Sequence, residues 1–295
     1  MNYEEGCRMR TEDWMKLNRT SIFEDTLLRR YVSPFPPAGL MQNTTGLQSE
    51  KDFAAHGTDI YTALSLASPK LLTEYQHILD FGCGCGRLAR MFKGHPHKIS
   101  GCDIDHRHVE WVNANLDFME AKLSSVIPPI PYEDNEMDAV ISISIFTHLT
   151  EKSQDDFLAE LFRVTRPGGV LFLTVHGAQA LKRACSEQPI RDMLDMDEEQ
   201  FKNSQEAFAQ NKHGFVLQYG HLTTTPQKMS SLGAISRKIR NWFSQELIST
   251  PFEYGIAFHP ETYIREHWSK WFDILDYRHG GIHQFQDIVV LTPRK

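Results

Sequence analysis

The feature that most constrains this chain is a run of three glycines at alternate positions, Gly82, Gly84 and Gly86, directly after an apolar segment, His77–Phe81. The short apolar segment is typical of a buried strand, and from Arg87 onward apolar residues recur with helical spacing. A strand, a glycine turn and a helix form the first half of a nucleotide-binding βαβ unit. Glycine permits the tight turn and a close approach of the backbone to a ligand, and a helix start there would offer free N–H groups.

Two acidic residues flank this turn and indicate the kind of ligand that it binds. Asp80 lies two residues before the first glycine, where a carboxylate can orient the turn or meet an ammonium group of a ligand. Asp103 ends the next strand-like run, Ile99–Cys102, where it can accept hydrogen bonds from two ribose hydroxyls. The turn therefore predicts a ligand that carries a ribose.

The glycine pattern alone leaves two cofactor classes open. The segment Gly84–Ala89 also satisfies the dinucleotide pattern of two glycines closed by an alanine, so a nicotinamide cofactor is an alternative. The two acids at Asp80 and Asp103 favour a different cofactor, described below. The choice depends on the rest of the chain.

Length and charge exclude several classes of protein. The 295 residues, 41% of them hydrophobic, suffice for one α/β domain with additions. A formal net charge of −7 provides no global basic field for nucleic acid. Because no apolar run is long enough to cross a membrane and Met1–Arg10 is polar and charged, we expect neither a membrane span nor a secretory signal. The five cysteines are odd in number, which favours reduced thiols in a cytoplasm.

Strands and helices continue to alternate after the glycine turn. Asp105 can cap a helix over His106–Leu116. The predicted strands that follow are Phe118–Ala121, Asp138–Ile145 and Val170–Val175. Open α/β sheets bind ligands at the carboxyl ends of their strands, so the crevice should lie at Ser144–His148 and at His176.

Several of these motifs together resemble those of a known family. The segment Leu79–Gly86 is similar to the Leu-Asp-x-Gly-x-Gly-x-Gly motif of class I S-adenosylmethionine-dependent methyltransferases. Three later segments, Ile130–Asp138, Ile145–Leu149 and Arg163–Gly169, follow in the order and spacing of that family. The chain looks most like the bacterial small-molecule branch, over about Gln76–Gly177 and again over its last forty residues.

The resemblance implies a fold and a domain organisation. The fold would be a doubly wound, Rossmann-like α/β sheet of seven strands with an antiparallel terminal hairpin. Residues 1–76 would form a helical cover or a lid, and 77–177 the S-adenosylmethionine-binding core. Residues 178–255 would form a substrate cap inserted between strands five and six, and 256–295 would complete the sheet.

The resemblance also implies which residues bind S-adenosylmethionine. Relatives often carry Asp or Asn after the third strand, where it contacts the adenine, whereas this chain has Glu120-Ala121-Lys122. Adenine contact by Glu120 or by the backbone both remain open. The predicted cofactor-binding residues are Asp80, Gly82, Cys83, Gly84, Gly86, Arg87, Asp103, Ile104, Glu120, Ser144 and Ile145.

A hydroxyl acceptor would need a base, and imidazole is well suited to that role near neutral pH. His176 and His148 both fall at carboxyl ends of central strands, and we take His176 as the first candidate. His259 and His283 are alternatives, and each of these histidines could instead be a hydrogen-bonded structural residue. We expect no metal, because Cys83-x-Cys85 has no companion pair.

The sequence therefore predicts a cytoplasmic enzyme that transfers a methyl group to oxygen or nitrogen of a small molecule, of specialised-metabolite or sugar type. An NAD-dependent reductase and a non-catalytic S-adenosylmethionine-binding module are the alternatives. We expect neither nucleic acid nor a membrane as partner. The sequence leaves the oligomeric state open.

Overall fold

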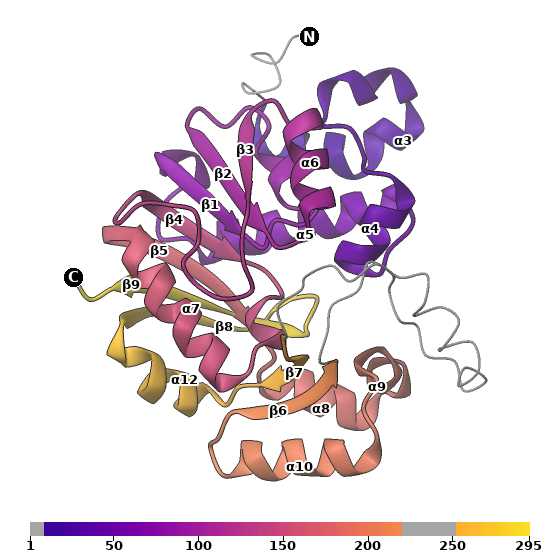
Figure 1. The fold of residues 1–295 in the computed structure, drawn as a ribbon. Coiled ribbons are helices and arrows are strands. Elements are labelled where there is room, and N and C mark those ends of the chain that lie inside the picture. Colours follow the sequence, from indigo (N-terminus) through magenta and orange to yellow (C-terminus); the bar gives the residue numbers. More distant parts are fainter. Residues whose placement is uncertain (1–8, 220–251) are drawn as a thin grey trace.

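A seven-stranded sheet forms the centre of the protein in the computed structural model, which describes residues 9–219 and 252–295. Its strand order is β3-β2-β1-β4-β5-β9-β8 (Figure 1). The first five strands in this order run parallel, and β9 and β8 are antiparallel to their neighbours. These strands are β1 (His77–Phe81), β2 (Lys98–Asp103), β3 (Met119–Leu123), β4 (Met137–Ser142), β5 (Thr165–Val175), β8 (Phe272–Ile282) and β9 (Gln286–Pro293). The doubly wound sheet with its antiparallel terminal hairpin is confirmed.

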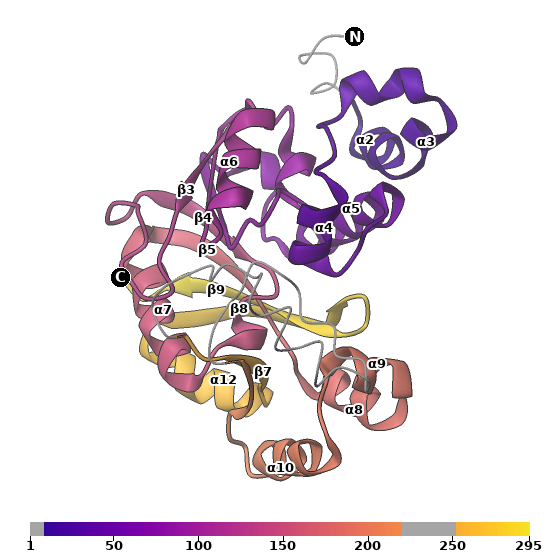
Figure 2. The same ribbon diagram turned by 45° about the vertical axis from the view of Figure 1, so that its right-hand side comes forward.

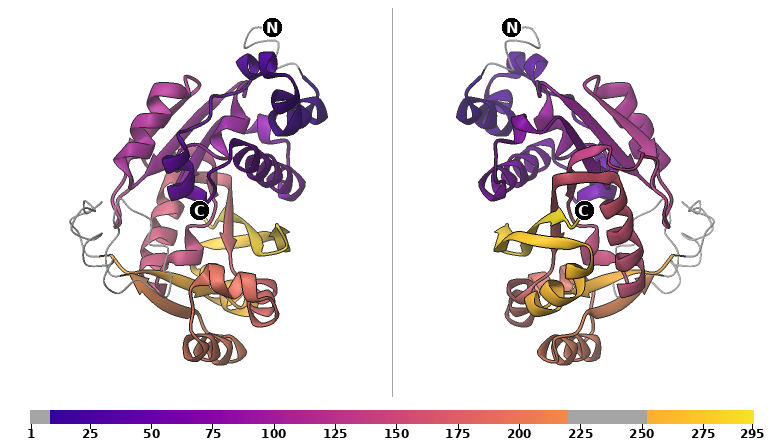
Figure 3. Two further views of the ribbon diagram at one scale, coloured as in Figure 1. Left: turned by 90° about the vertical axis from the view of Figure 1, so that its right-hand side faces the viewer. Right: turned by 90° about the vertical axis from the view of Figure 1, so that its left-hand side faces the viewer.

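Helices cover both faces of this sheet, as Figure 3 shows. The described α-helices are α2 (Thr11–Lys16), α3 (Ile22–Glu24), α4 (Ala38–Thr45), α5 (Glu50–Ala67), α6 (His106–Asn115), α7 (Glu151–Val164), α8 (Ala178–Ser186), α9 (Gln188–Leu194), α10 (Glu198–Ala209) and α12 (Glu261–His267). Tighter or wider helical turns occupy Leu17–Ser21, Thr26–Tyr31, Leu72–Glu74, Ala89–Phe92, Phe146–His148 and Trp268–Lys270. Within the described ranges, no helix has the length and apolar character needed to cross a membrane.

The alternation of side chains along each strand divides the core between the two faces. In β1, Ile78 packs with the N-terminal helices and α6, whereas Leu79 packs with α7 and α12. The central strand β4 is buried along its whole length, which explains its nearly continuous apolar sequence. The capping residues Asp105 and Thr150 begin α6 and α7, and each side chain accepts a backbone N–H of the first turn.

The inserted segment has a small sheet and core of its own. Strand β6 (Gly214–Tyr219) pairs antiparallel with β7 (Tyr254–Phe258), and residues of α8, α9 and α10 pack against them. Figure 2 shows α8, α9 and α10 at the end of the molecule opposite α2 and α3. Of the predicted cap at 178–255, residues 220–251 lie outside the described residues. A bridge from His176 to Phe258 attaches β7 to the end of β5.

One local prediction is wrong. No α-helix follows the glycine turn. Residues 82–88 form successive turns, and only Ala89–Phe92 completes a short 3-10 helix. Arg90 in this turn is 1% exposed and donates a hydrogen bond to the Ser33 carbonyl. Because Gly94 then takes a left-handed backbone conformation (φ 90°), the chain turns into β2 before a longer helix can form.

Candidate active site

A cavity of about 340 Å³ lies at the carboxyl ends of β1, β2 and β4. This is the edge at which parallel sheets bind ligands, and the volume lies within the range of small-molecule pockets. The cavity is lined by Asn43, Thr44, Phe81, Gly82, Gly84, Arg87, Cys102, Asp103, Ile104, Asp105, Arg107, His108, Ser124, Ser125, Val126, Ile143, Ser144, Ile145, His148, Leu149, Phe157, Phe252 and Tyr254.

The glycine turn forms the floor of this cavity. Gly82 and Gly84 both have left-handed backbone conformations, with φ of 76° and 52°. A Cβ at Gly82 would lie 2.3 Å from Cδ1 of Ile145, and one at Gly84 would lie 2.4 Å from Cγ2 of Thr44. Both the backbone angles and the space therefore require glycine at these positions.

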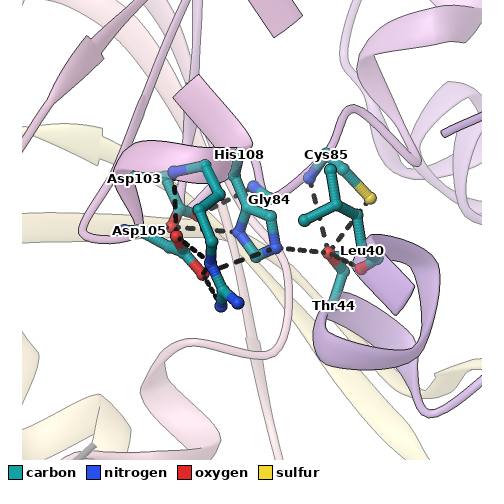
Figure 4. A network of polar contacts seen from close by, with 8 residues as sticks. Leu40, Thr44, Gly84, Cys85, Asp103, Asp105 and His108 are labelled. Atoms are coloured by element: carbon teal, nitrogen blue, oxygen red, sulfur yellow. Dashed lines mark hydrogen bonds and ion pairs between the residues drawn. The ribbon is translucent and has the colours of Figure 1, made fainter. Parts of the chain in front are cut away.

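Asp103 is held at the end of β2 by backbone donors. One carboxylate oxygen accepts a hydrogen bond of 2.8 Å from the N–H of Gly84, and the other accepts one of 2.9 Å from the N–H of Asp105. Nδ1 of His108 lies 3.4 Å from the second oxygen (Figure 4). These bonds fix the plane of the carboxylate and leave lone pairs for a ligand in the cavity.

An N-terminal residue completes the same network. The hydroxyl of Thr44, in α4, lies 3.1 Å from Sγ of Cys85 and 3.4 Å from Nε2 of His108 (Figure 4). It also donates to the Leu40 carbonyl at 3.1 Å. Thr44 thus joins α4 to the glycine turn and to α6. Sequence reasoning missed it because nothing in Asn43-Thr44 differs from an ordinary loop.

Beneath the turn lies a buried carboxylate, Asp80, whose ionisation is influenced by the charge of Arg87. Asp80 is 3% exposed, and its Oδ2 has no hydrogen-bond partner within the described part of the chain. Burial raises the pKa of Asp80 to about 7, although the positive charge of Arg87 acts in the opposite direction. Arg87 lines the cavity, whereas Asp80 lies behind it. An unpartnered buried carboxylate beside a cavity is suited to receive a cationic group from a ligand.

His148 faces the cavity from the turn that follows β4. Its Nδ1 lies 2.8 Å from the carbonyl oxygen of Gly255, so Nδ1 carries the proton and Nε2 is the unprotonated nitrogen. The ring of Tyr254 stacks on the imidazole at 4.4 Å with an interplanar angle of 16°. Burial lowers the pKa of His148 to about 4. The neutral imidazole therefore persists throughout the physiological pH range.

The structure does not bring His176 to the cavity. It is 3% exposed and packs against the rings of Phe258 and Phe285, at 5.7 and 4.9 Å. Its Nδ1 has no partner among the described residues, and burial lowers its pKa to about 3. The reason is that β7 lies across the end of β5 and covers the position predicted to be open.

The two alternative histidines also lie away from the cavity lining. His259 is fully buried, and its Nε2 lies 2.7 Å from the side-chain oxygen of Gln154. His283 occupies the tip of the β8–β9 hairpin, 3.2 Å from a carboxylate oxygen of Asp59. Of the four histidines considered from the sequence, His148 alone lines the cavity.

Four predicted cofactor residues do not line the cavity: the buried Asp80 described above, and Glu120, Cys83 and Gly86. Glu120 is exposed in the middle of β3, whereas the cavity edge forms beyond the end of that strand, at Ser124–Val126. Cys83 and Gly86 lie within the turn and pack into the core, against Gly101 and Leu116 respectively. Gly82, Gly84, Arg87, Asp103, Ile104, Ser144 and Ile145 do line it.

Side chains suited to metal binding do not gather in the described ranges. No group of three or more His, Cys, Asp or Glu side chains at 9–219 or 252–295 is arranged to hold a metal ion. Cys83, Cys85 and Cys102 are buried as free thiols. Burial raises the pKa of Cys85 to about 11, which keeps that thiol protonated.

The fold and the glycine-turn cavity define a class of protein, and comparison with known proteins agrees. Residues 79–173 match the family described as methyltransferase domain. The chain contains a class I S-adenosylmethionine-dependent methyltransferase domain. Its cofactor is S-adenosylmethionine, as the resemblance implied.

Curated relatives share this region at modest identity. A Mycolicibacterium smegmatis protein named as an S-adenosylmethionine-dependent methyltransferase is 30% identical over 97 residues, 33% of this chain and 37% of the relative. The tRNA N(3)-methylcytidine methyltransferase Mettl2 of Drosophila melanogaster is 24% identical over 123 residues, 38% of each chain. The fatty-acid O-methyltransferase of M. smegmatis is 31% identical over 110 residues, 34% of this chain and 37% of the relative. The chain thus spans less than two fifths of their lengths.

A solved structure extends the likeness of fold beyond that region. A protein from Pyrococcus horikoshii superimposes with a TM-score of 0.52 at 13% identity, covering 86% of this chain and 96% of its own. At this identity the likeness concerns the fold alone.

Proposed function

We propose that the protein transfers a methyl group from S-adenosylmethionine to an oxygen or nitrogen atom of a small-molecule acceptor. The observation that carries this proposal is the cavity itself. It is lined both by Asp103, a fixed carboxylate suited to accept ribose hydroxyls, and by His148, which has an unprotonated imidazole nitrogen. One end of the cavity suits the cofactor, and the other supplies a proton acceptor.

The residues around the glycine turn fit the cofactor. Asp103 would accept the ribose hydroxyls, because its carboxylate is held in place by backbone donors. Arg87, which lines the cavity, would face the carboxylate of the methionine part, and the buried Asp80 behind the lining would favour the ammonium group through its negative charge. Ser124–Val126 would border the adenine in place of Glu120. When bound, the cofactor supplies a methyl group already activated on a sulfonium.

His148 is the proposed base. Its Nδ1 proton is held by the Gly255 carbonyl, so Nε2 can only accept a proton. With a pKa of about 4 the imidazole is a weak base that is always available. The protein's main contribution is then orientation and exclusion of water, as expected when the reacting group is already activated.

The proposed organisation assigns each part of the chain a role. Residues 1–76 cover the cofactor through Asn43 and Thr44, and 77–177 form the cofactor-binding core. Residues 178–255 are proposed as the acceptor cap, from whose described part Phe252 and Tyr254 reach the cavity, and 256–295 supply β8 and β9 of the main sheet. A small acceptor is favoured over RNA because the chain carries a net charge of −7.

The test combines binding and turnover. Calorimetry with S-adenosylhomocysteine measures cofactor binding, and labelled S-adenosylmethionine with a panel of small hydroxyl and amine compounds, read by mass spectrometry, measures transfer. Binding with transfer to a panel member supports the proposal. Binding with no transfer to any small compound, but with transfer to tRNA, would overturn the small-molecule assignment. NADH binding without adenosylhomocysteine binding would overturn the whole proposal.

A further inference from the structure

We infer that strand β7 completes the catalytic site, with Tyr254 as a positioning residue for His148, and that the acceptor group is a neutral hydroxyl. This inference rests on the proposed function and refines it. Two consecutive residues of β7 act on one imidazole. The Gly255 carbonyl oxygen accepts a hydrogen bond of 2.8 Å from Nδ1, and the Tyr254 ring stacks on one face of the imidazole with 4.4 Å between the ring centroids.

These two contacts leave His148 little freedom. A hydrogen bond to Nδ1 fixes the tautomer, and a ring stacked at 16° fixes the plane of the imidazole. Within the described ranges, β7 and β5 pack closely against the turn at Phe146–His148, and the Trp268 ring lies 5.6 Å from that of Phe146. The titratable side chains that they present to His148 are Tyr254 and, at 6.5 Å between rings, His176. Burial lowers the pKa of His176 to about 3, so that ring is neutral at neutral pH, and the contacts orient the His148 imidazole without ionising it.

The geometry of Gly255 explains why β7 can approach so closely. A Cβ at this position would lie 2.1 Å from the carbonyl oxygen of Val216 and 2.6 Å from the ring of Phe215, both in β6. Only glycine therefore allows β6 and β7 to pair here while the Gly255 carbonyl points to His148. The pairing of β6 with β7 and the position of the His148 imidazole therefore depend on the same residue, Gly255.

The fixed tautomer selects the chemistry of the acceptor. Nε2 of His148 presents a lone pair, which attracts an O–H or N–H donor and repels a carboxylate, and of these groups the hydroxyl is the one that needs a base for its proton. Among the described residues that line the cavity, Leu149, Phe252 and Tyr254 follow His148 or belong to the return towards β7, and all three are aliphatic or aromatic. The charged pair Asp105–Arg107 lies at the end of β2, which β1 separates from β4. A hydroxyl on an uncharged body is the acceptor group that this end of the cavity can receive.

The proposed transfer step accounts for every bond, electron pair and proton with three groups: the acceptor hydroxyl, the methyl sulfonium of the cofactor and His148. An oxygen lone pair of the hydroxyl forms the new bond to the methyl carbon while the methyl–sulfur bond breaks, and its electron pair stays on sulfur. The hydroxyl proton passes to Nε2 of His148. Product departure then allows the imidazolium to lose that proton to water, which its low pKa favours.

The first test needs no acceptor. In the free, ¹⁵N-histidine-labelled protein, NMR should show His148 protonated on Nδ1, with a titration midpoint near pH 4. Tyr254→Leu should move this midpoint upward by at least one pH unit, because water reaches the ring, whereas Tyr254→Phe should leave it within about half a unit. Finding the proton on Nε2, or an unchanged midpoint in Tyr254→Leu, would overturn the positioning role.

The second test uses turnover and a matched control. Tyr254→Leu should lower kcat at least about tenfold, with adenosylhomocysteine affinity unchanged, and Tyr254→Phe should retain most activity. Leu217→Ala, a half-exposed position paired with Gly255 in the same small sheet, controls for damage to β6–β7.

The acceptor class is tested with pairs of compounds that share one carbon skeleton and carry either a hydroxyl or a carboxylate. In each pair only the hydroxyl compound should be methylated. Reaction of the carboxylate would refute the acceptor class, and loss of adenosylhomocysteine binding in the parent protein would instead refute the proposed function.

Discussion

The carboxylate of Asp103 and the backbone N–H of Gly84 meet at 2.8 Å, although 19 residues separate them in the chain. This bond ties the end of β2 to the glycine turn that follows β1, so the two motifs recognised in the sequence form one binding surface. The same carboxylate also accepts the N–H of Asp105. Its orientation is therefore set before any ligand arrives.

Asp103→Ala should weaken S-adenosylhomocysteine binding by about 1–3 kcal/mol, because a charged hydrogen-bond acceptor is lost. Calorimetry measures this directly. Asp117→Ala, which removes an exposed carboxylate after α6, is the matched control and should bind like the parent. Equal affinities for the two variants would remove Asp103 from the cofactor site.

Gly84→Ala should destabilise the protein by more than about 1 kcal/mol, because φ is 52° and the new Cβ would lie 2.4 Å from Cγ2 of Thr44. Thr44→Ser removes that methyl group and keeps the hydroxyl. In the double variant part of the loss should return, which gives a coupling of about 0.5–3 kcal/mol between neighbouring sites. Urea unfolding of the four proteins measures this cycle. Strictly additive effects would mean that the clash is relieved by movement of α4.

His148→Ala should lower kcat by roughly 10²–10⁴-fold, the usual contribution of a general base. His176→Gln should retain most activity, since His176 lies outside the cavity lining. In the parent protein, kcat/KM should rise with pH around pH 4 and be constant above about pH 5. A histidine with an ordinary pKa would instead place this rise at about pH 6–7. A normal rate for His148→Ala would mean that positioning alone accounts for the transfer.

Stability should fall as the pH is lowered from 7 to 5, partly because of His176. Its folded pKa of about 3 lies below the unfolded value of about 6.5. Between these values the unfolded chain binds a proton that the folded protein does not, so stability rises with pH. Asp80, with a folded pKa of about 7, acts in the opposite sense.

A variant isolates the contribution of His176. His176→Gln should reduce the slope of unfolding free energy against pH by up to roughly 1.4 kcal/mol per pH unit near pH 5. Denaturant unfolding at several pH values measures the slope, and His106→Gln, at an exposed position, serves as control. An unchanged slope in His176→Gln would mean that water reaches the His176 ring.

The sheet was predictable because its signals are local. The apolar run at Ile78–Phe81, the alternating glycines and Asp103 each lie within a few residues of the strand end that they define. Motif order then implied the strand order, which the structure confirms. The short turn after Gly86 was not predictable, since its apolar residues recur as they would in a helix and its contact from Arg90 to Ser33 spans 57 residues.

The acceptor side of the cavity was also not predictable, because it too depends on contacts between residues far apart in the chain. His176 and His148 are equivalent in sequence, because both follow central strands. What distinguishes them is β7, which covers His176 through Phe258 and holds His148 through Gly255. These contacts join residues 82 and 107 positions apart, and no periodicity or spacing in one sequence reports them.

The bridge between His176 and Phe258 brings the point where the chain leaves the core beside the point where it returns. A segment with adjoining ends can change in length or sequence at little entropic cost to the rest of the fold. Under the proposed function, evolution or a protein engineer could therefore vary the parts of this segment outside β6 and change which molecules are methylated. Strand β6 and the residues from 254 onward would have to stay, because β7 pairs with β6 and holds the proposed base.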